Sequence, residues 1–214
     1  ELKTPITLLR LSMEETLQDE NLPLPLQERL LAQERALARI SQLIKSLLDL
    51  SHLELSESLK KETFSLNELV GSVAEEFQGL MQDQKLRFSS QFDGEVTMHA
   101  DREMIRRMLI NLLDNAIRYN QPNGEIRCQA RADKGRTTLV FANTGPGIAP
   151  SDQSRIFDQF YRCEKSRSTA HGGSGLGLAI VKRIVELHDG DIAVADEPPA
   201  WTVFRVNIPT DAAA

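Results

Sequence analysis

The stretch Asn111-Leu-Leu-Asp-Asn115-Ala-Ile-Arg118-Tyr119 decides the fold of this chain. Its apolar residues recur at helical spacing, and the spacing also places four polar side chains on one helix face: Asn111, Asn115, Arg118 and Tyr119. Asparagine is a poor helix former, so two of them in mid-helix indicate a polar ligand, with a solvated helix face as the ordinary alternative. An asparagine oxygen suits Mg²⁺, while the arginine suits phosphate and the tyrosine can stack on a base.

Two glycine-rich stretches follow this helix. Asn143-Thr-Gly145-Pro-Gly147-Ile148 comes directly after a predicted strand, where the glycines either let the backbone approach a ligand closely or form an ordinary turn. Gly172-Gly173-Ser174-Gly175-Leu176-Gly177-Leu178 opens a predicted helix, where free backbone N–H groups favour a phosphate. The second stretch is not a Walker loop, because no Gly-Lys-Ser/Thr follows, and a long polar loop before it argues against a Rossmann turn.

The order of these stretches carries more information than any one of them. With Phe157-Asp-Gln-Phe160-Tyr161-Arg162 between the glycine-rich pair, they closely resemble the N, G1, F and G2 boxes of sensor histidine kinases. Those kinases share an ATPase superfamily with gyrase, the mismatch-repair ATPases and the large heat-shock chaperones. Glu1-Leu-Lys-Thr4-Pro5 resembles the second to sixth letters of the family's H box, His-Glu-Leu-Lys-Thr-Pro. Arg162-Cys-Glu-Lys-Ser-Arg and Asn143 look most like the heavy-metal-type members.

The resemblance implies an α+β fold in two parts. Residues 1–60 would form an antiparallel helical hairpin that dimerises into a four-helix bundle and carries the phosphorylated histidine. Residues 61–214 would form a Bergerat-type α/β sandwich that binds ATP. The implied activity is ATP-dependent autophosphorylation on histidine, followed by transfer to an aspartate of a cognate response regulator and dephosphorylation of that partner.

The resemblance also implies roles for individual residues. ATP and Mg²⁺ are the implied cofactors, with Asn115 as the Mg²⁺ ligand. Residues 147–175 would form a mobile lid that Phe157 and Phe160 pack onto the core. The implied nucleotide-binding residues are Asn111, Asn115, Arg118, Tyr119, Asn143, Gly145, Gly147, Ile148, Phe157, Tyr161, Arg162, Gly173, Ser174, Gly175, Leu176, Gly177, Leu178 and Thr202.

The sequence departs from the family pattern at three places. The acceptor histidine is expected immediately before Glu1, and no histidine of the printed sequence is followed by Glu-Leu-x-Thr-Pro. Asn143 stands where the G1 box usually has Asp. Its amide oxygen can accept a hydrogen bond from the adenine amino group, but it lacks the negative charge of Asp, so we expect weaker recognition of adenine. Pro198-Pro-Ala-Trp201-Thr202 replaces the final Gly-x-Gly-Thr, which leaves only Thr202.

Glu1 and Thr4 are the candidate catalytic residues. A histidine before Glu1 would lie four positions from Thr4, on the same helix face. Glu1 would take the ring proton while the other ring nitrogen attacks the γ-phosphate. Thr4 would position a water that removes phosphate from the partner aspartate, although Thr4-Pro5 also fits a simple helix kink.

The first third of the chain differs in composition from the rest. Residues 1–63 contain no glycine and no aromatic residue but many leucines, which predicts long helices. Pro23 and Pro25 end the first helix, and the second, from about Pro25 to Leu55, carries a heptad seam at Leu30, Leu37 and Ile44. The apolar stripe is broader than one partner helix covers, which predicts a homodimer; packing against the chain's own C-terminal domain is the alternative.

The remaining two thirds alternate between strand and helix patterns, as in a layered α/β sandwich. The expected helices are 66–77, 101–119 and 175–188, the first of these after a short strand. The expected further strands are 86–92, 96–99, 125–132, 137–143, 192–195 and 202–208.

Composition narrows the function further. A net charge of -6 argues against a nucleic-acid partner, and two cysteines without a ligand cluster fit a reducing compartment. The sequence has no apolar run of the ~18 residues that cross a bilayer, so we expect no membrane contact and a cytoplasmic domain of a protein anchored in the inner membrane. A hydrolysing ATPase of the same superfamily would carry a glutamate where Asn111 stands, and a non-enzymatic ATP-binding scaffold is the third alternative.

Overall fold

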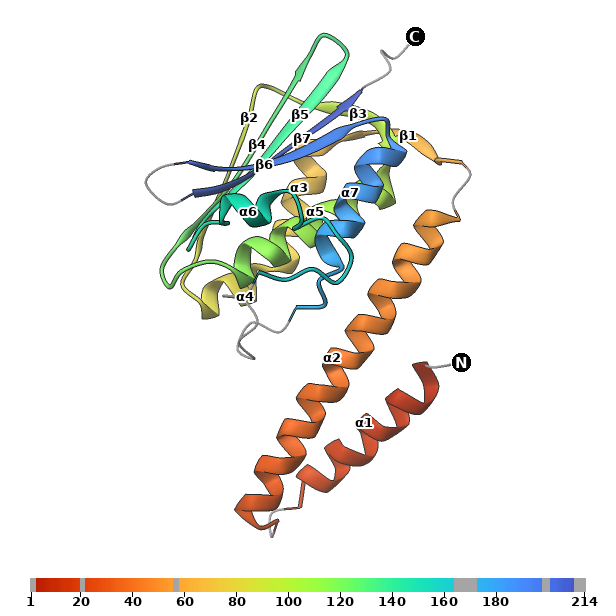
Figure 1. The fold of residues 1–214 in the computed structure, drawn as a ribbon, viewed down its shortest axis with the longest axis vertical. Coiled ribbons are helices and arrows are strands. Elements are labelled where there is room, and N and C mark those ends of the chain that lie inside the picture. Colours follow the sequence, from red (N-terminus) through yellow and green to blue (C-terminus); the bar gives the residue numbers. More distant parts are fainter. Residues whose placement is uncertain (1–2, 20–21, 56–57, 164–172, 198–200, 210–214) are drawn as a thin grey trace.

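The computed structural model describes residues 3–19, 22–55, 58–163, 173–197 and 201–209. A helical hairpin extends from one end of an α/β domain (Figure 1). Its two helices are α1 (Lys3–Leu17) and α2 (Leu24–Glu54), and the expected break at the prolines is present. Pro23 caps α2 and Pro25 lies in its first turn, where the missing N–H costs no helical hydrogen bond.

The α/β domain contains two sheets. Strands β1 (Lys61–Ser65) and β3 (Thr97–Asp101) pair antiparallel. The larger sheet has the order β2-β4-β5-β7-β6, in which only the β2–β4 pair is parallel. Its strands are β2 (Arg87–Phe92), β4 (Glu125–Asp133), β5 (Arg136–Thr144), β6 (Asp191–Glu197) and β7 (Trp201–Pro209).

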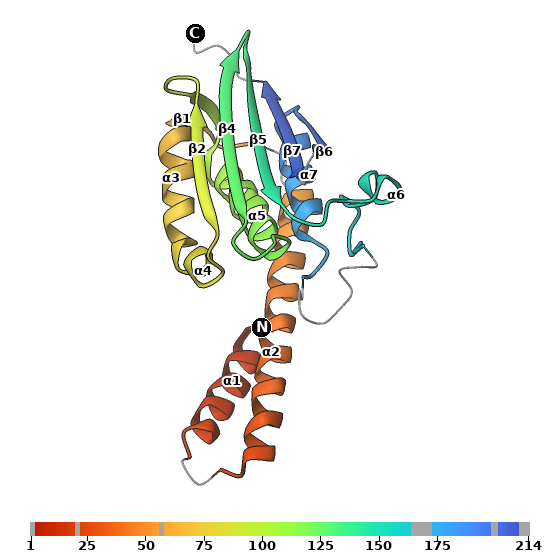
Figure 2. The same cartoon turned by 90° about the vertical axis from the view of Figure 1, so that its left-hand side faces the viewer.

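Three helices cover one face of the larger sheet, and the other face is left open (Figure 2). They are α3 (Leu66–Glu76), α5 (Arg102–Arg118) and α7 (Gly177–Leu187), accompanied by the short helices α4 (Gln78–Asp83) and α6 (Pro150–Gln153). The core lies between these helices and the sheet; Ile105, Ile126 and Ile184 in it are 0 % exposed. The expected α/β sandwich is confirmed in this coarse form.

Helix α5 is fixed at its N-terminus by buried polar contacts. The Asp101 carboxylate accepts hydrogen bonds from the backbone N–H of Met104 at 3.1 Å and of Lys60 at 3.0 Å. The backbone N–H of Asp101 donates to Nε2 of the buried His188 at 3.1 Å. The predicted cap at Asp101 is therefore present, and it sets the register with which α5 presents its polar face.

The last turns of α2 pack against the α/β domain. Leu50 and Leu53 are 4 % and 2 % exposed and belong to the domain core. Asp49 forms an ion pair with Arg107 of α5, and Gln159 donates to the Glu54 carboxylate at 3.4 Å. The rest of the hairpin leaves large apolar side chains exposed, so only the C-terminal end of α2 follows the alternative of packing on its own domain.

The structure differs most from expectation at the start of α7 and in two short helices. Helix α7 begins at Gly177, because Gly175 has φ +71°, which no right-handed helix adopts. Helices α4 and α6 were not expected from the sequence. None of the helices in the described ranges is both long and apolar enough to cross a membrane.

Candidate functional site

Helix α5 separates an apolar face from a polar one, as its sequence predicts. Leu109, Leu112, Leu113 and Ala116 are at most 2 % exposed, and they anchor the helix under the sheet. Asn111, Asn115, Arg118 and Tyr119 are each half-buried on the other side. Packing therefore fixes the backbone while the polar side chains remain partly accessible, which is the arrangement a bound ligand needs.

The Asn115 amide is available to a ligand. Its side chain makes no hydrogen bond within the part of the chain that the structure describes, although Asn115 is partly buried. By contrast, Asn111 donates to the Arg107 carbonyl at 2.8 Å, and Arg118 contacts both oxygens of Asp114 at 3.0 and 3.2 Å. An uncommitted amide oxygen fits Mg²⁺, which takes few protein ligands beside phosphate oxygens and waters.

The N-terminus of α7 lies directly beside this polar face. A methyl group at Gly177 would come within 3.1 Å of the Asn111 Oδ1 atom. Leu176, the residue before the helix, is 0 % exposed, and its backbone N–H bonds to the Ser174 hydroxyl at 3.2 Å. Gly177 thus allows the close approach of α5 and α7 that brings the first and last predicted stretches together.

The end of β5 lies against the other end of α5. A methyl group at Gly145 would collide with the carbonyl oxygen of Tyr119, so this glycine is required by the fold itself. Gly147 has φ +71°, a conformation that favours glycine. The turn after β5 is therefore built against the C-terminus of α5, with Ile148 half-buried just beyond it.

Asn143 and Thr202 face each other in the sheet. They are register partners in β5 and β7, and they are 3 % and 6 % exposed on the helix-covered side. The Asn143 amide nitrogen donates to the Thr144 carbonyl at 2.9 Å, so its oxygen is the atom left to accept. Trp201, the neighbour of Thr202, points to the opposite face, so the altered final box keeps Thr202 in place.

The segment that was expected to form a lid begins with a well-packed stretch. Phe157 makes an edge-to-face contact with the buried Phe204, with ring centroids 6.4 Å apart. The Tyr161 hydroxyl donates to Asp152 at 2.7 Å, and this bond raises the pKa of Tyr161. Burial, and then the same carboxylate, raises the pKa of Cys163.

The expectation for Phe160 is wrong. Its side chain is 58 % exposed and does not pack onto the core. Its backbone carries the contact instead: φ is +63°, and its N–H donates to the Gly175 carbonyl at 2.9 Å. A methyl group at Gly175 would lie 2.8 Å from the Phe160 carbonyl carbon, so the two stretches pack backbone to backbone.

Several predicted residues lie outside what the structure describes. Glu1 and Gly172 are outside the described residues, as are residues 164–171 and 198–200. Thr4 lies in the first turn of α1. Arg162, Gly173, Ser174 and Leu178 are half-buried in the segments that flank 164–172.

Sequence reasoning missed three polar partners at the site: Arg107, Asp114 and Asp152. Each holds a predicted residue or its neighbour, since Arg107 joins α5 to α2, Asp114 holds Arg118 and Asp152 holds Tyr161. Of these contacts, only the ion pair between Asp114 and Arg118 could have been predicted from the sequence, because the two residues are four positions apart on one helix.

The arrangement defines a class of protein: an α/β sandwich in which an asparagine-bearing helix meets two glycine turns and a helix N-terminus. The chain belongs to the family of histidine kinase-, DNA gyrase B- and HSP90-like ATPases, whose model matches residues 100–212. Its curated relatives include the sensor protein SphS of Synechococcus elongatus, which is 35 % identical over 99 % of this chain and 53 % of SphS. The chain therefore spans about half of that relative.

Two solved structures extend the likeness to the hairpin. The Acinetobacter baumannii histidine kinase AdeS is 28 % identical, covering 99 % of this chain and 98 % of that one, with a TM-score of 0.70. The histidine kinase ThkA in complex with response regulator TrrA is 25 % identical, covering 97 % of this chain and 57 % of that one, with a TM-score of 0.71. The resemblance to sensor histidine kinases is confirmed.

Proposed function

We propose that this chain is the catalytic core of a sensor histidine kinase and binds Mg²⁺-ATP along the polar face of α5. The observation that carries the proposal is the convergence of Asn111 on Gly177 and of Tyr119 on Gly145. These contacts bring three separate stretches of sequence together at the polar face of α5. The family match, which is to ATPases, supports the same reading.

The residues divide between the base and the phosphates of ATP. Asn143 directs its free amide oxygen toward the adenine amino group, and the neighbouring Thr202 lines the same end of the site. Tyr119 lies against the nucleoside. At the other end, the free N–H groups at the start of α7 face the phosphates, and the helix dipole favours their charge.

Arg118 and Asn115 serve the phosphates. Arg118 is held by Asp114 and reaches a phosphate oxygen by exchanging or sharing that partner. Asn115 is the residue that would hold Mg²⁺, and the metal would supply charge neutralisation at the phosphate oxygens. Gly147, Ile148, Phe157, Tyr161, Arg162, Gly173, Ser174, Gly175, Leu176 and Leu178 border the nucleotide from the side of the expected lid.

We further propose that residues 1–60 are the dimerisation and phosphotransfer unit and residues 61–214 the catalytic unit. Two hairpins pack as a four-helix bundle, and the acceptor is a histidine immediately before Glu1. Glu1 removes the ring proton as the other ring nitrogen attacks the γ-phosphorus; the bond to the bridging oxygen breaks, and ADP leaves. The phosphoryl group then passes to an aspartate of a response regulator, a partner class that the ThkA complex supports.

The competing functions receive less support. A hydrolysing ATPase needs a base where Asn111 stands, and an amide cannot take a proton from water. The two solved structures are those of histidine kinases, which also weighs against a non-enzymatic scaffold. The unit would act in the cytoplasm as part of a membrane-anchored sensor.

Nucleotide binding is tested first. Titration calorimetry with a non-hydrolysable ATP analogue and Mg²⁺ should give saturable binding. Asn115→Ala should weaken it about ten-fold or more, through loss of the metal ligand. Asn207→Ala, which removes the same amide from the open face of the sheet, is the matched control and should bind as the parent does. Failure of the parent to bind at millimolar nucleotide would refute the site.

Phosphotransfer is tested with a chain extended by one histidine before Glu1. Labelled ATP should place acid-labile, base-stable phosphate on it, and an extension by glutamine should take up none. Glu1→Gln in the histidine-extended chain should slow labelling by roughly 10²-fold. Thr4→Ala should slow dephosphorylation of the partner. Equal labelling of the glutamine-extended chain would show that the acceptor has been misplaced.

A further inference from the structure

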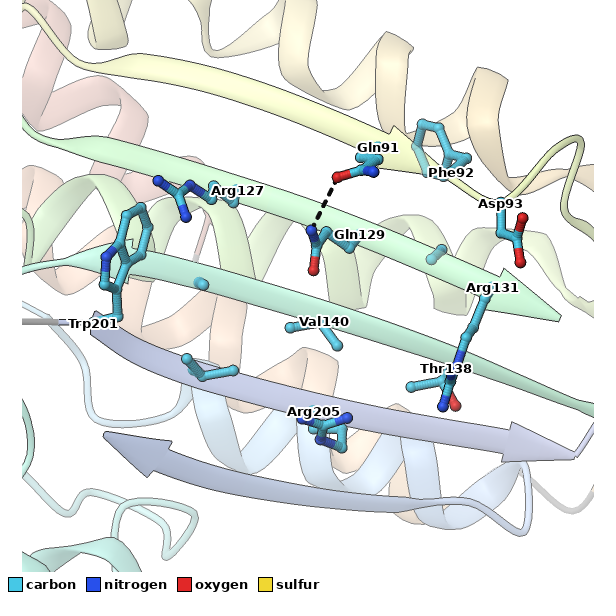
Figure 3. A pocket seen from close by; sticks show the side chains of 13 residues that line it. Gln91, Phe92, Asp93, Arg127, Gln129, Arg131, Thr138, Val140, Trp201 and Arg205 are labelled. Carbon is cyan, nitrogen blue, oxygen red and sulfur yellow. Dashed lines mark hydrogen bonds between the residues drawn. The ribbon is translucent and has the colours of Figure 1, made fainter. Parts of the chain in front are cut away.

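The open face of the five-stranded sheet carries a shallow cavity of about 700 Å³, on the opposite side of the sheet from Asn143 and Thr202 of the candidate nucleotide site (Figure 3). Register defines it: Arg127 lies opposite Ala142, which lies opposite Val203, and the next row on the same face is Gln129, Val140 and Arg205. The helices lie behind the sheet in this view, so nothing in the described chain covers the cavity.

One end of the cavity is formed by an aromatic ring and a guanidinium group. Arg127 lies over the Trp201 ring at 4.0 Å from its centroid. Small side chains form the floor beside this pair, with Ala142 8 % and Val203 4 % exposed although no helix covers them. Arg127 and Trp201 therefore project above the short side chains of Ala142 and Val203, which leaves room for another chain to lie against the sheet.

The cavity is basic, in contrast to the chain as a whole. Arg131 and Arg205 are exposed, and neither side chain has an ion pair or hydrogen bond with the residues that the structure describes. Arg127 is shared with Glu125 at 3.0 Å, and Asp93 is the acidic residue among those that line the cavity. Three arginines against one carboxylate line the cavity, while the register places Glu125, Asp133 and Asp191 on the same face outside the lining. The positive charge is therefore local to the cavity in a chain of net charge -6.

The distances between these arginines match the distances between acidic side chains of a short extended peptide. Arg127 and Arg131 are four residues apart on β4, which places them about 13 Å apart along the strand. Arg205 lies two strands away from Gln129, at a lateral distance of roughly 10 Å. An extended segment with two or three carboxylates spaced by 10–13 Å matches this set, approximately as an i, i+4 pattern on a strand.

We propose that this face docks a short acidic segment of a partner protein. The carboxylates of the segment pair with Arg205, Arg131 and the free edge of Arg127, and an apolar side chain lies against Trp201. We infer an acidic partner because arginines line the cavity and carboxylates would complement their charge. Because screening limits attraction to about 8 Å at physiological salt, a short segment experiences the local cations rather than the net charge of the chain.

A single-stranded nucleic acid fits the face less well. Such ligands stack successive bases on several aromatic rings, whereas among the described residues that line the cavity Phe92 is the one aromatic residue besides Trp201. A long polyanion would also extend over the acidic remainder of the surface. The proposed docking uses none of the residues assigned to the nucleotide, and its test contains no nucleotide, so the two proposals fail separately.

The single tryptophan provides the measurement. Fluorescence of Trp201 in the full chain should change saturably when a short poly-L-glutamate peptide is added, and the affinity should fall as salt is raised. Arg131→Glu with Arg205→Glu should weaken binding about ten-fold or more, and Arg131→Gln with Arg205→Gln by an intermediate factor. Arg102→Glu reverses one charge on α5, behind the sheet, which is half of the charge change in the double variant, and should leave the affinity unchanged.

Four results would overturn the proposal. They are an unchanged Trp201 signal with poly-L-glutamate, equal weakening by Arg102→Glu, a response to oligothymidylate in place of the peptide, and a changed sedimenting mass for the Arg131→Glu and Arg205→Glu variant. The third result would indicate nucleic acid, and the fourth would indicate a contact between copies of this chain. Far-UV circular dichroism and unfolding midpoints establish that each variant is folded.

Discussion

The hairpin and the α/β domain bury their aliphatic side chains to different extents. In the α/β domain Ile105 is 0 % exposed and Leu109 is 1 % exposed, whereas in the hairpin Leu9 is 56 % and Ile40 48 % exposed. The helices α1 and α2 contact each other, yet their combined apolar surface is larger than either covers. The α/β core is therefore complete within one chain, and the hairpin needs a second surface to complete its own.

The largest expected effect comes from the complete core. Ile105→Ala removes most of a fully buried side chain from α5, where the close packing cannot collapse into the space. We expect the free energy of unfolding to fall by about 2–5 kcal/mol. Urea unfolding followed by Trp201 fluorescence measures it. The loss should not depend on protein concentration, and a concentration-dependent loss would contradict a core completed by one chain.

The same substitution in the hairpin should act through association. Ile40→Ala removes a side chain that is about half exposed in one chain, so the cost per protomer is about 1 kcal/mol and the dimer loses about twice that. Sedimentation equilibrium should give about twice 24.0 kDa for the parent chain and a dissociation constant raised roughly 30-fold for the variant. A parent chain that stays monomeric at tens of micromolar would remove the basis of the comparison.

A buried histidine in the domain should make stability depend on pH. Desolvation lowers the pKa of His188 below its ordinary 6.5, with Lys61 acting in the same direction; the Ile184 carbonyl, Asp101 and Asp189 act against it. The unfolded chain then binds a proton at higher pH than the folded chain does. The free energy of unfolding should therefore be highest above pH 6.5 and decrease as the pH falls below it.

The matched variants are His188→Gln in the domain and His52→Gln in the hairpin. Protonation of His188 would also remove the acceptor for the backbone N–H of Asp101. Asp101 is the residue whose side chain caps α5. His188→Gln should flatten the stability profile between pH 7.5 and 5.5, whereas His52→Gln, at an exposed position, should not. Coincident profiles for the parent chain and His188→Gln would exclude this histidine as the source.

The smallest effect is expected where the two regions meet. Asp49 of α2 and Arg107 of α5 are each about one quarter exposed, at 25 % and 27 %. A double-mutant cycle with Asp49→Asn and Arg107→Gln should give a coupling energy of about 0.5–1 kcal/mol, because solvent still screens the pair. Urea unfolding of the four chains measures it. A coupling near zero would mean that this ion pair does not stabilise the junction.

Local patterns predicted most of the fold. The proline break, the Asp101 cap, the polar face of α5 and nearly all strands follow from spacing and turn chemistry, which act within a few residues. Helices α4 and α6 have six and four residues, too few for a helical period to be recognised. The sequence also could not predict how the end of α2 packs. Leu50 and Leu53 continue the apolar stripe of the helix, and only tertiary packing distinguishes them from its other residues.

The candidate site was predictable as a set of residues but not as a geometry. The meeting of Asn111 with Gly177, 66 positions later, came from the resemblance to a family and not from any local rule. Phe160 shows why side chains are harder than backbones, because its left-handed φ turns the ring outward while its N–H still binds Gly175. The side of the sheet that Trp201 faces depends on the strand register, which the altered final box did not reveal.

Helix α2 belongs to two cooperative units at once. Its last turns share the α/β core through Leu50 and Leu53, so their amide hydrogens exchange with solvent only when that core opens. Its first turns, from Leu24 onward, pack against α1 and, in the proposed homodimer, against a second chain. Amide exchange along this one helix should therefore slow from the N-terminal to the C-terminal end. The position at which the rate changes marks where protection by association gives way to protection by the α/β core.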